Sequence, residues 1–392
     1  LFLKNKEQIN KKSNIDLDLK YILDIRDFPG SPFEGKFTKD INDILNDDEV
    51  TLVAEVMGGV NPAFDFVKSC LERGKSVVSS NKELVAKKGA ELLRTAKEHN
   101  CNFLFEASTG GAIPIIRPLH QCLAANDITA VAGILNGTTN FILTKMINEN
   151  MPFAEALSTA QKLGYAEKDP TADVEGHDAC RKICILSSLV FGKHVYPDWV
   201  HCEGISDITA EDAQYAESWG GAVKLIGSVK RTADGKILPI VRPAFVCGAN
   251  QLSSVNDVFN GIMVYGDAID QVMFYGRGAG KFPTASAIVA DLIDAAKMKG
   301  TSISQVWEDS KDNSFIADYK EDVLPFYVRV QGVSKDKAKE VFGEVEFLTR
   351  ENCPADEIAF ITPEIKEKDF DEKLTQLGGK VLGKIRVLNL ES

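Results

Sequence analysis

The sequence predicts an α/β protein with an incomplete doubly wound domain, an α+β domain and a small C-terminal ferredoxin-like domain. Short apolar runs alternate with helical segments over residues 17–108, a pattern typical of βαβ units and a parallel sheet. Mixed helices and strands follow to about residue 300. A β-α-β-β-α-β order then begins near residue 324, which indicates the third domain.

In the first part, residues 1–12 are expected to form the tail of an amphipathic helix. Strands are predicted at 17–25, 51–59, 75–80 and 101–108. Helices are predicted at 62–74, where Gly74 is the C-terminal glycine, and at 82–100.

Further along, the expected strands are 128–135, 236–247 and 268–275, and the expected helices follow 136, 178 and 280. A polar stretch at 308–322 is typical of a linker. The C-terminal unit has predicted strands at 326–333, 345–352, 356–363 and 380–390 and predicted helices at 335–344 and 366–378.

Composition limits the class of protein. A chain of 392 residues is long enough for two or three domains, and its net charge of −12 argues against a nucleic-acid partner. No apolar run reaches membrane-spanning length and no secretory signal is visible. The eight cysteines are scattered, and Cys180 and Cys184 are expected to pack as small apolar groups. These features predict a cytoplasmic protein.

A dinucleotide-binding domain of the Rossmann type begins with a strand, G-x-G-x-x-G and a helix, which bind the pyrophosphate. This sequence contains no such fingerprint and opens at Leu1, apparently within that first helix. Because the first strand is central in a doubly wound sheet, we expect this chain to be an N-terminally truncated form of a longer protein.

The stretch from Ala160 to Lys182 concentrates acidic residues around helix-breaking glycine and proline. Residues 165–176 are expected to be a loop, and the apolar run after Asp178 a buried helix. Asp178 and Lys182 stand four residues apart and so share one helix face. An isolated pair of this kind is commonly a surface ion pair, but beneath an acidic loop it can bind a charged substrate and move a proton.

The pattern G-Y-A-E-x-D-P-x-x-D-V-x-G-x-D-x-x-x-K at 164–182 closely resembles the signature of homoserine dehydrogenases. The similarity continues in the blocks 55–63, 79–86, 105–115, 133–143 and 276–287. It implies NAD(P)-dependent interconversion of L-aspartate 4-semialdehyde and L-homoserine, a step of threonine, methionine and isoleucine biosynthesis. A regulatory binding protein with a degenerate catalytic domain, and a dehydrogenase for another amino-acid aldehyde, are the alternatives.

The resemblance also implies a domain plan. A dinucleotide-binding domain spans 1–130 and is completed by about 276–307, and a substrate-binding, catalytic and dimerisation domain spans 131–275. A linker at 308–323 leads to an ACT-like regulatory domain at 324–392. The family is commonly dimeric or tetrameric, so a homodimer or homotetramer is expected.

By matching position, Lys182 is the proposed general acid, Asp178 orients its ammonium group and Lys82 is a second cation in the site. Aldehyde reduction requires a proton at the developing alkoxide, which lysine can donate. Glu167 matches the residue that binds the substrate's amino group. The other implied substrate-binding residues are Asp173, Asp178, Tyr165, Gly164 and Thr138. His177 occupies a variable slot and is not expected to be catalytic.

Near the end of the second expected strand lie Asp24, Arg26 and Asp27, where such domains recognise the ribose. They favour NADP with NAD tolerated, although a solvated charged turn explains them equally well. The implied cofactor-binding residues are Arg26, Met57, Gly58, Gly59, Ser80, Lys82, Asn136, Gly278, Ala279 and Gly280. The structural alternatives are a strand-to-helix turn for Gly58 and Gly59 and a helix N-cap for Asn136.

Some relatives hold a sodium or similar monovalent ion where this chain has residues 106–113. The matching backbone ligands are those of Glu106, Thr109, Gly111 and Ile113. A glycine turn packed under the substrate domain is the alternative.

ACT domains that bind ligands usually carry D-x-P-G between the first strand and helix. Here that place reads GVSKDKAKEVF, without the Pro-Gly turn. An amino-acid effector such as threonine is implied only by family analogy, and a module kept for subunit contacts is equally compatible.

Overall fold

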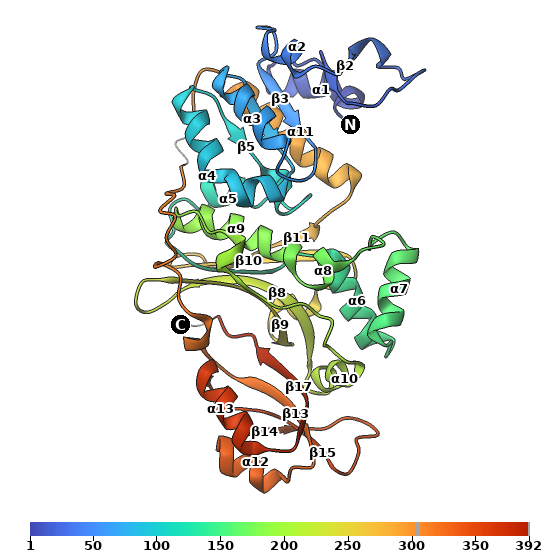
Figure 1. The fold of residues 1–392 in the computed structure, drawn as a ribbon, viewed down its shortest axis with the longest axis vertical. Helices are drawn as coiled ribbons and strands as arrows, with labels where there is room; N and C mark the ends of the chain where they lie inside the picture. Colours follow the sequence, from blue (N-terminus) through green and yellow to red (C-terminus); the bar gives the residue numbers. More distant parts are fainter. Residues whose placement is uncertain (303–305, 391–392) are drawn as a thin grey trace. The chain divides into compact units, whose positions relative to one another are not determined.

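The computed structural model describes residues 1–302 and 306–390, whose contacts divide the chain into two compact units. Unit 1 comprises Leu1–Gln121, Ser188–His194 and Ala279–Ser310, and unit 2 comprises Cys122–Ser187, Val195–Gly278 and Lys311–Ser392 (Figure 1). Residues 303–305, in the predicted completing segment, and 391–392, at the predicted C-terminal domain's end, lie outside the described residues. Within the described part, no helix combines the length and apolar character needed to cross a membrane.

Unit 1 contains two parallel sheets. β1 (Ile22–Leu23) pairs with β2 (Phe37–Thr38), and β3 (Leu52–Glu55), β4 (Ser76–Ser79) and β5 (Phe103–Leu104) pair in that order. Its helices are α1 (Phe2–Ser13), α2 (Ile41–Leu45), α3 (Ala63–Glu72), α4 (Lys82–Glu98), α5 (Ile116–His120) and α11 (Lys281–Lys297). α11 contacts β3 and β4, so a segment from late in the sequence packs on this sheet.

All four strands predicted in unit 1 are shorter in the structure, where the strand at 51–59 is Leu52–Glu55 and the strand at 75–80 is Ser76–Ser79. The expected strand at 17–25 is reduced to Ile22–Leu23, and the one at 101–108 to Phe103–Leu104. β1 pairs along only one edge, with β2. After Leu104 the chain bends into η2 (Glu106–Ser108), where the Glu106 carboxylate accepts hydrogen bonds from three backbone N–H groups at the start of α5.

A groove of about 430 Å³ lies between β1 and β3. The two strands themselves line it, together with Phe66 and Val67 of α3 and Leu292 of α11. The two parallel sheets of unit 1 therefore have an apolar space between their facing strands.

Unit 2 is built on one mixed sheet in the order β11-β10-β6-β8-β9-β17-β13-β15-β14. Its first five strands are β11 (Asp270–Arg277), β10 (Phe259–Gly266), β6 (Ile128–Ile134), β8 (Gly221–Arg231) and β9 (Ile237–Cys247), and β7 (His201–Cys202) pairs with β9. The helices here are α6 (Gly137–Asn148), α7 (Phe153–Lys162), α8 (Thr171–Val174), α9 (His177–Phe191) and α10 (Ala210–Ser218). The prediction of a continuous loop over 165–176 is wrong in part, because Thr171–Val174 forms one helical turn after Pro170.

The predicted β-α-β-β-α-β order of the C-terminal part is confirmed. Its elements are β13 (Phe326–Gln331), α12 (Lys335–Phe342), β14 (Glu346–Leu348), β15 (Glu357–Ile361), α13 (Glu367–Leu377) and β17 (Lys380–Val387). The spatial order β17-β13-β15-β14 is a ferredoxin-like arrangement, and Phe326 stacks on Phe370 at 3.8 Å in its core. β17 also pairs with β9, so this module extends the unit 2 sheet.

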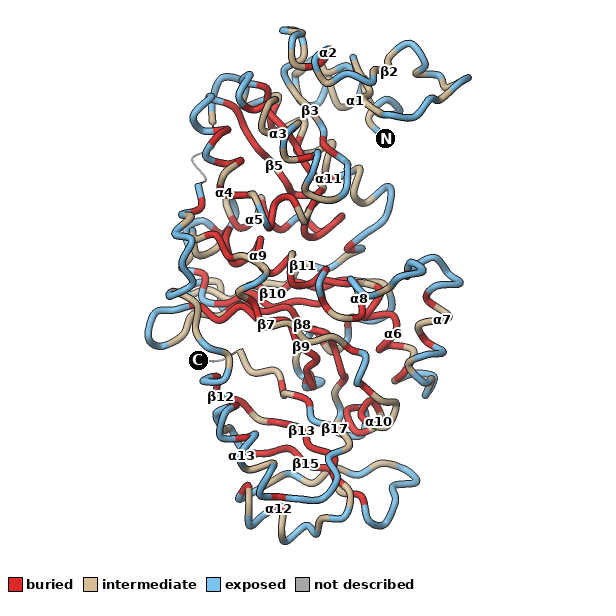
Figure 2. Tube along the Cα trace, in the orientation of Figure 1, coloured by how far each residue is buried: buried red, intermediate tan, exposed pale blue. Residues whose placement is uncertain are grey.

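The remaining elements are short. They are β12 (Val323–Leu324), β16 (Ile365–Lys366), η1 (Glu34–Lys36), η3 (Pro197–Trp199), η4 (Gln251–Ser254) and η5 (Tyr319–Glu321). In Figure 2 the buried residues follow the strands β8 to β10 and helix α9, whereas α7 and α12 carry mainly exposed and intermediate residues. Part of the unit 2 core lies where its sheet meets α9, and further buried clusters surround Leu252 and fill the C-terminal module.

Candidate active site

The first turn of α9 positions an acid and a lysine in a nearly closed environment. Lys182 is 6% exposed and Asp178 is 5% exposed. The Lys182 Nζ donates to Asp178 Oδ2 at 2.7 Å and to the Leu135 backbone carbonyl at 2.7 Å. Among the described residues these bonds account for two of the three ammonium hydrogens, so one remains available for another oxygen.

Asn136 joins this pair to the acidic loop. It is the N-cap of α6, and its Oδ1 accepts from the Thr139 backbone N–H. Its Nδ2 donates to Asp173 Oδ1 at 2.7 Å and to Asp178 Oδ2 at 2.9 Å. The N-cap alternative is therefore confirmed, and the same side chain also bridges two of the predicted site acids.

The loop before α8 supplies the more exposed side of this cluster. Thr138 donates its hydroxyl to the Tyr165 carbonyl at 2.8 Å, which holds the loop against α6. Glu167 is exposed, and its backbone carbonyl accepts from Gln161 Nε2. Tyr165 is also exposed and packs edge-on against Phe141. A charged ligand can reach these groups from solvent.

In unit 1, a second polar cluster lies at the carboxyl ends of β3 and β4, the edge where doubly wound sheets bind ligands. Glu55 accepts from Ser79 Oγ at 2.5 Å and from the Met57 backbone N–H at 2.6 Å. Asn81 caps α4 and donates to the Gly59 carbonyl at 2.6 Å. Burial raises the pKa of the Glu55 carboxyl group.

The predicted cofactor residues of unit 1 flank this cluster. Lys82 is the first residue of α4, and a Cβ added at Gly58 or Gly59 would meet no atom within 4 Å. Gly59 has a φ of 74°. The backbone is therefore open to a ligand at this edge, which fits a bound dinucleotide.

The acid and arginine after β1 form a local ion pair. Arg26 donates to both carboxylate oxygens of Asp24, and the Arg26 guanidinium lowers the pKa of Asp24 to about 2. Asp27 pairs with Lys39 at 2.7 Å. Arg26 is largely exposed, so its guanidinium is accessible to an anionic ligand.

At the predicted cation position, the Glu106 side chain is already engaged with the N-terminus of α5. Its backbone N–H donates to Asp291 Oδ2, and Ile113 donates its N–H to the Gly110 carbonyl. No group of three or more His, Cys, Asp or Glu in the described residues could hold a metal. That observation concerns side chains, whereas the predicted ligands are backbone carbonyls.

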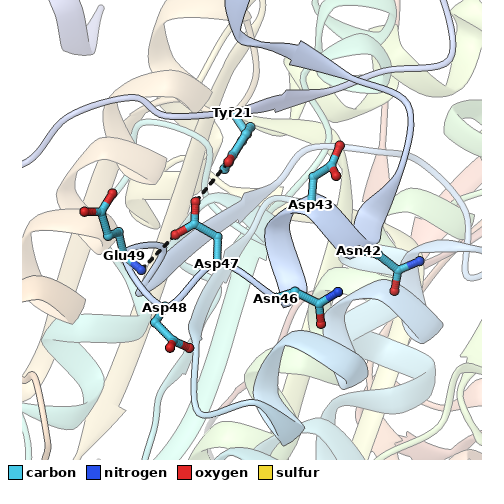
Figure 3. A pocket seen from close by; sticks show the side chains of 7 residues that line it. All are labelled: Tyr21, Asn42, Asp43, Asn46, Asp47, Asp48 and Glu49. Carbon is cyan, nitrogen blue, oxygen red and sulfur yellow. Dashed lines mark hydrogen bonds between the residues drawn. The ribbon is translucent and has the colours of Figure 1, made fainter.

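The pocket drawn in Figure 3 lies at the opposite edge of the unit 1 sheets. Tyr21 precedes β1 and Asp47 precedes β3, so the pocket is at the amino ends of these parallel strands. Asp47 Oδ2 accepts from the Tyr21 hydroxyl at 2.9 Å (Figure 3). Since ligands of doubly wound sheets bind at the carboxyl ends, this acidic pocket is not the expected cofactor site.

Sequence reasoning missed three groups of these clusters. The Leu135 carbonyl accepts from Lys182, and Glu55 and Ser79 pair between two strands. A carbonyl carries no residue-type signal. Glu55 is a buried acid at the end of an apolar strand, and this position could have identified it.

An α/β domain open at its carboxyl edge and a buried lysine held by a carboxylate both fit a nucleotide-dependent oxidoreductase. Residues 7–106 match the NAD-binding domain of homoserine dehydrogenase, and residues 114–293 match the homoserine dehydrogenase family itself.

The chain is 40% identical to the homoserine dehydrogenase of Bacillus subtilis over 355 residues, covering 87% of this chain and 81% of that protein. A crystal structure of a homoserine dehydrogenase from Thiobacillus denitrificans has a TM-score of 0.88 and 30% identity, covering 100% of this chain and 94% of that one. The chain belongs to the homoserine dehydrogenase family, whose members are NAD(P)-dependent oxidoreductases.

A hyperthermophilic archaeal homoserine dehydrogenase in complex with NADPH is also similar, with a TM-score of 0.62 and 27% identity over 74% of this chain and 92% of that one. This neighbour, together with the matched NAD-binding domain, supports NAD(P) as the cofactor class.

Proposed function

We propose that this chain interconverts L-aspartate 4-semialdehyde and L-homoserine with NAD(P)H, and that Lys182 is the proton donor. The observation that carries this proposal is the buried Lys182–Asp178 pair with its ammonium group held beneath the acidic loop. The reaction serves threonine, methionine and isoleucine biosynthesis by family analogy.

A bound nicotinamide supplies or accepts the hydride at the substrate's carbonyl carbon. The remaining Lys182 N–H donates to the developing alkoxide oxygen, and the proton follows as charge builds there. In the direction of homoserine oxidation the same nitrogen takes the proton from the substrate's hydroxyl group. Asp178 and the Leu135 carbonyl fix Nζ in place and need not themselves change protonation.

The substrate's amino-acid end is assigned to the loop. Glu167 binds the ammonium group, and Asp173 lines the same side through its bond to Asn136. The exposure of Glu167 and Tyr165 supports this role, because the ligand enters from solvent. Lys82 is assigned as a second cation facing cofactor and substrate.

For the cofactor, NADP with NAD tolerated is the proposed preference, supported by the exposed Arg26 guanidinium after β1. Arg26→Ala is expected to raise the KM for NADPH about tenfold while the KM for NADH changes little, since a 2′-phosphate contact contributes roughly 1.5–3 kcal/mol. Steady-state kinetics with both cofactors measures this. Equal increases for both would contradict a 2′-phosphate contact.

Three further roles rest on family analogy. A sodium or similar ion is proposed at the backbone carbonyls of Glu106, Thr109, Gly111 and Ile113. The ferredoxin-like module is proposed to be an ACT-like domain for an amino-acid effector or for subunit contacts within a homodimer or homotetramer. A cytoplasmic location is proposed, supported by eight cysteines that are all free thiols.

The domain plan is proposed with boundaries at 1–130 with 276–307, 131–275, 308–323 and 324–392. The groove between β1 and β3 supports an additional strand in the first domain, because both facing strands run parallel to their own partners and apolar side chains line the space. A strand inserted there would join the two sheets of unit 1 into one.

Lys182→Ala tests the proposed chemistry. Turnover of homoserine is expected to fall roughly a hundredfold or more, in line with general acid–base catalysis. His177→Ala is the matched control, because His177 is exposed on the first turn of the same helix and should keep near-native turnover. Near-native activity of a folded Lys182→Ala protein would reject the assignment.

A further inference from the structure

The carboxamide of Asn260, the second residue of β10, lies between two glycines from different motifs. A Cβ added at Gly278 would fall 2.0 Å from Asn260 Nδ2 and 2.2 Å from its Cγ. A Cβ added at Gly137, the first residue of α6, would fall 2.8 Å from the Val258 carbonyl and 3.4 Å from Asn260 Oδ1. The carboxamide leaves no room for a side chain at Gly278, whereas at Gly137 the Val258 carbonyl excludes one and the carboxamide lies at contact distance.

The register places Asn260 on the sheet face that α9 covers. Ile262 pairs with Gly133, and Gly133 pairs with Gly227. Directly opposed residues share a face, and a Cβ at Gly227 would lie 3.5 Å from Ile183 Cβ of α9. Asn260 is two residues before Ile262, so it points to that same face, where α9 carries Lys182.

The chain before Asn260 is tied to α6. Asn140, one turn after the N-cap Asn136, donates its Nδ2 to the carbonyls of Val255 and Phe259. Asn136 in turn bridges Asp173 and Asp178. The Asn260 carboxamide thus lies next to Gly137 at the start of α6, the helix capped by Asn136, and next to Gly278 in the glycine segment 276–280.

Asn260 is 1% exposed, and its Oδ1 has no hydrogen-bond partner among the described residues. An unpaired buried acceptor is unfavourable, and an apolar side chain would fill the same space without that penalty. The penalty marks a polar group kept for its position or its chemistry rather than for stability.

We propose that Asn260 is a positioning residue for the dehydrogenase reaction, holding Gly278 and Gly137 in register by filling the space between them. This inference rests on the proposed function, in which residues 278–280 bind the cofactor and Asn136 belongs to the site. The carboxamide acts through these two backbone segments and does not itself touch the reacting atoms.

A double-mutant cycle on the intact chain tests whether the Asn260 carboxamide and the backbone at Gly278 act together. Gly278→Ala is expected to lower kcat/KM for the cofactor about tenfold, and Asn260→Ala alone about threefold. Because Asn260→Ala opens the space that the new methyl group needs, the double variant is expected to be at least about threefold better than Gly278→Ala alone. Effects that simply multiply would overturn the proposal.

Gly261→Ala is the matched control. Gly261 lies on the same strand with its missing Cβ on the opposite face, 2.7 Å from Met273 Cε and 3.0 Å from Val255 Cγ2. It should lower the melting temperature and leave the KM for the cofactor near the wild-type value. A change in the cofactor KM equal to that of Gly278→Ala would show that any crowded glycine has this effect.

NADPH binding, followed by its fluorescence, separates this inference from the proposed chemistry. If the wild type binds NADPH without turning over homoserine, the proposed function fails. The recovery that Asn260→Ala gives to Gly278→Ala is then still measured, as a change in the affinity for NADPH. If Gly278→Ala does not fold, recovery of folding in the double variant supports the proposal. If Gly278→Ala and the double variant both fail to fold, the Asn260→Ala variant decides. A cofactor KM of Asn260→Ala equal to that of the wild type would overturn the proposal.

Discussion

Lys224, in the middle of β8, places its ammonium group where no solvent reaches it. The side chain is 0% exposed, and Nζ donates to Asn140 Oδ1 at 3.1 Å, the Val255 carbonyl at 2.5 Å and Asn256 Oδ1 at 3.0 Å. All three acceptors are neutral. Burial therefore lowers the pKa of Lys224 to about 8, with Asp257 opposing the shift from a distance.

This residue gives unfolding a specific pH dependence. Between about pH 8 and 10.5 the unfolded chain binds the proton that folded Lys224 has lost, so stability rises with pH in that window. Relative to Lys224→Met, the wild type should gain on the order of 2 kcal/mol from pH 8 to 10. Urea unfolding at several pH values measures the difference in stability. A wild-type stability that does not rise relative to Lys224→Met from pH 8 to 10 would contradict the prediction.

Asn136 combines two tasks that substitutions can separate. Asn136→Ser keeps an N-cap oxygen for α6, whereas Asn136→Ala removes it and should lose about 1 kcal/mol of stability. Both variants lose the amide that bridges Asp173 and Asp178, so both should lower kcat/KM for homoserine about tenfold. Thermal unfolding and steady-state kinetics measure the two effects. Full activity of the serine variant would show that the bridge is dispensable.

Among elements, α5 and α11 are joined by one arginine. Arg117 donates to Asp291 Oδ1 at 2.7 Å and to Asp294 Oδ2 at 2.7 Å, and Asp291 also accepts from the Glu106 backbone N–H. Burial is the main cause that raises the pKa of Asp291 to about 7. The stability linked to Asp291 is fully present below pH 3.8 and is lost as pH rises through 7.

Arg117→Met should therefore lower the free energy of unfolding more at high pH than at low pH. At pH 5.5 Asp291 is mostly neutral and depends little on its partner, whereas at pH 8.5 an unpaired buried carboxylate remains. We expect a loss of about 2 kcal/mol at pH 8.5, below the range for fully enclosed pairs because Arg117 is partly exposed. Chemical unfolding at the two pH values checks this. A loss independent of pH would assign the effect to Asp294 alone.

At the scale of the whole molecule, the ferredoxin-like module is part of unit 2 rather than an appendage on a tether. β17 pairs with β9, and Arg329 of β13 donates to Asp212 of α10 at 2.9 Å. Tyr327 donates its hydroxyl to the same carboxylate, and Arg329 also contacts Glu357. This buried network connects the module to the helix beside β8.

Asp212→Ala should destabilise unit 2 and the module together. It leaves the 5% exposed Arg329 with less compensation and removes the capping box of α10, a loss of about 3 kcal/mol. Unfolding followed by tryptophan fluorescence, which reports Trp199 and Trp219 of unit 2 and also Trp307 of unit 1, should shift in parallel with far-UV circular dichroism. Separate transitions, with only one moved by the substitution, would show that the module unfolds independently.

Local sequence gave reliable information where local physics decides. The i, i+4 spacing of Asp178 and Lys182 predicted their pairing, and alternating apolar segments predicted the order of strands and helices over residues 51–108. The strands β8 and β10 of unit 2 were not predicted. The lengths of β1 and β5 were overestimated, because strand length depends on partners that hydrogen-bond along the whole segment. The helical turn at Thr171–Val174 replaces part of the predicted loop because proline breaks a helix interior but is tolerated at a helix start, where Pro170 is the N-cap.

From the sequence alone came the family resemblance, the α/β class, the acidic loop and the lysine on the helix after it. Only the tertiary structure decided that Asn136 bridges two acids, that the Leu135 carbonyl holds Lys182, and that β17 extends the sheet through β9. Helix faces and turn signals depend on neighbours in the chain, so sequence reveals them. Buried hydrogen bonds between distant segments depend on strand register and packing, which exist only once the chain has folded.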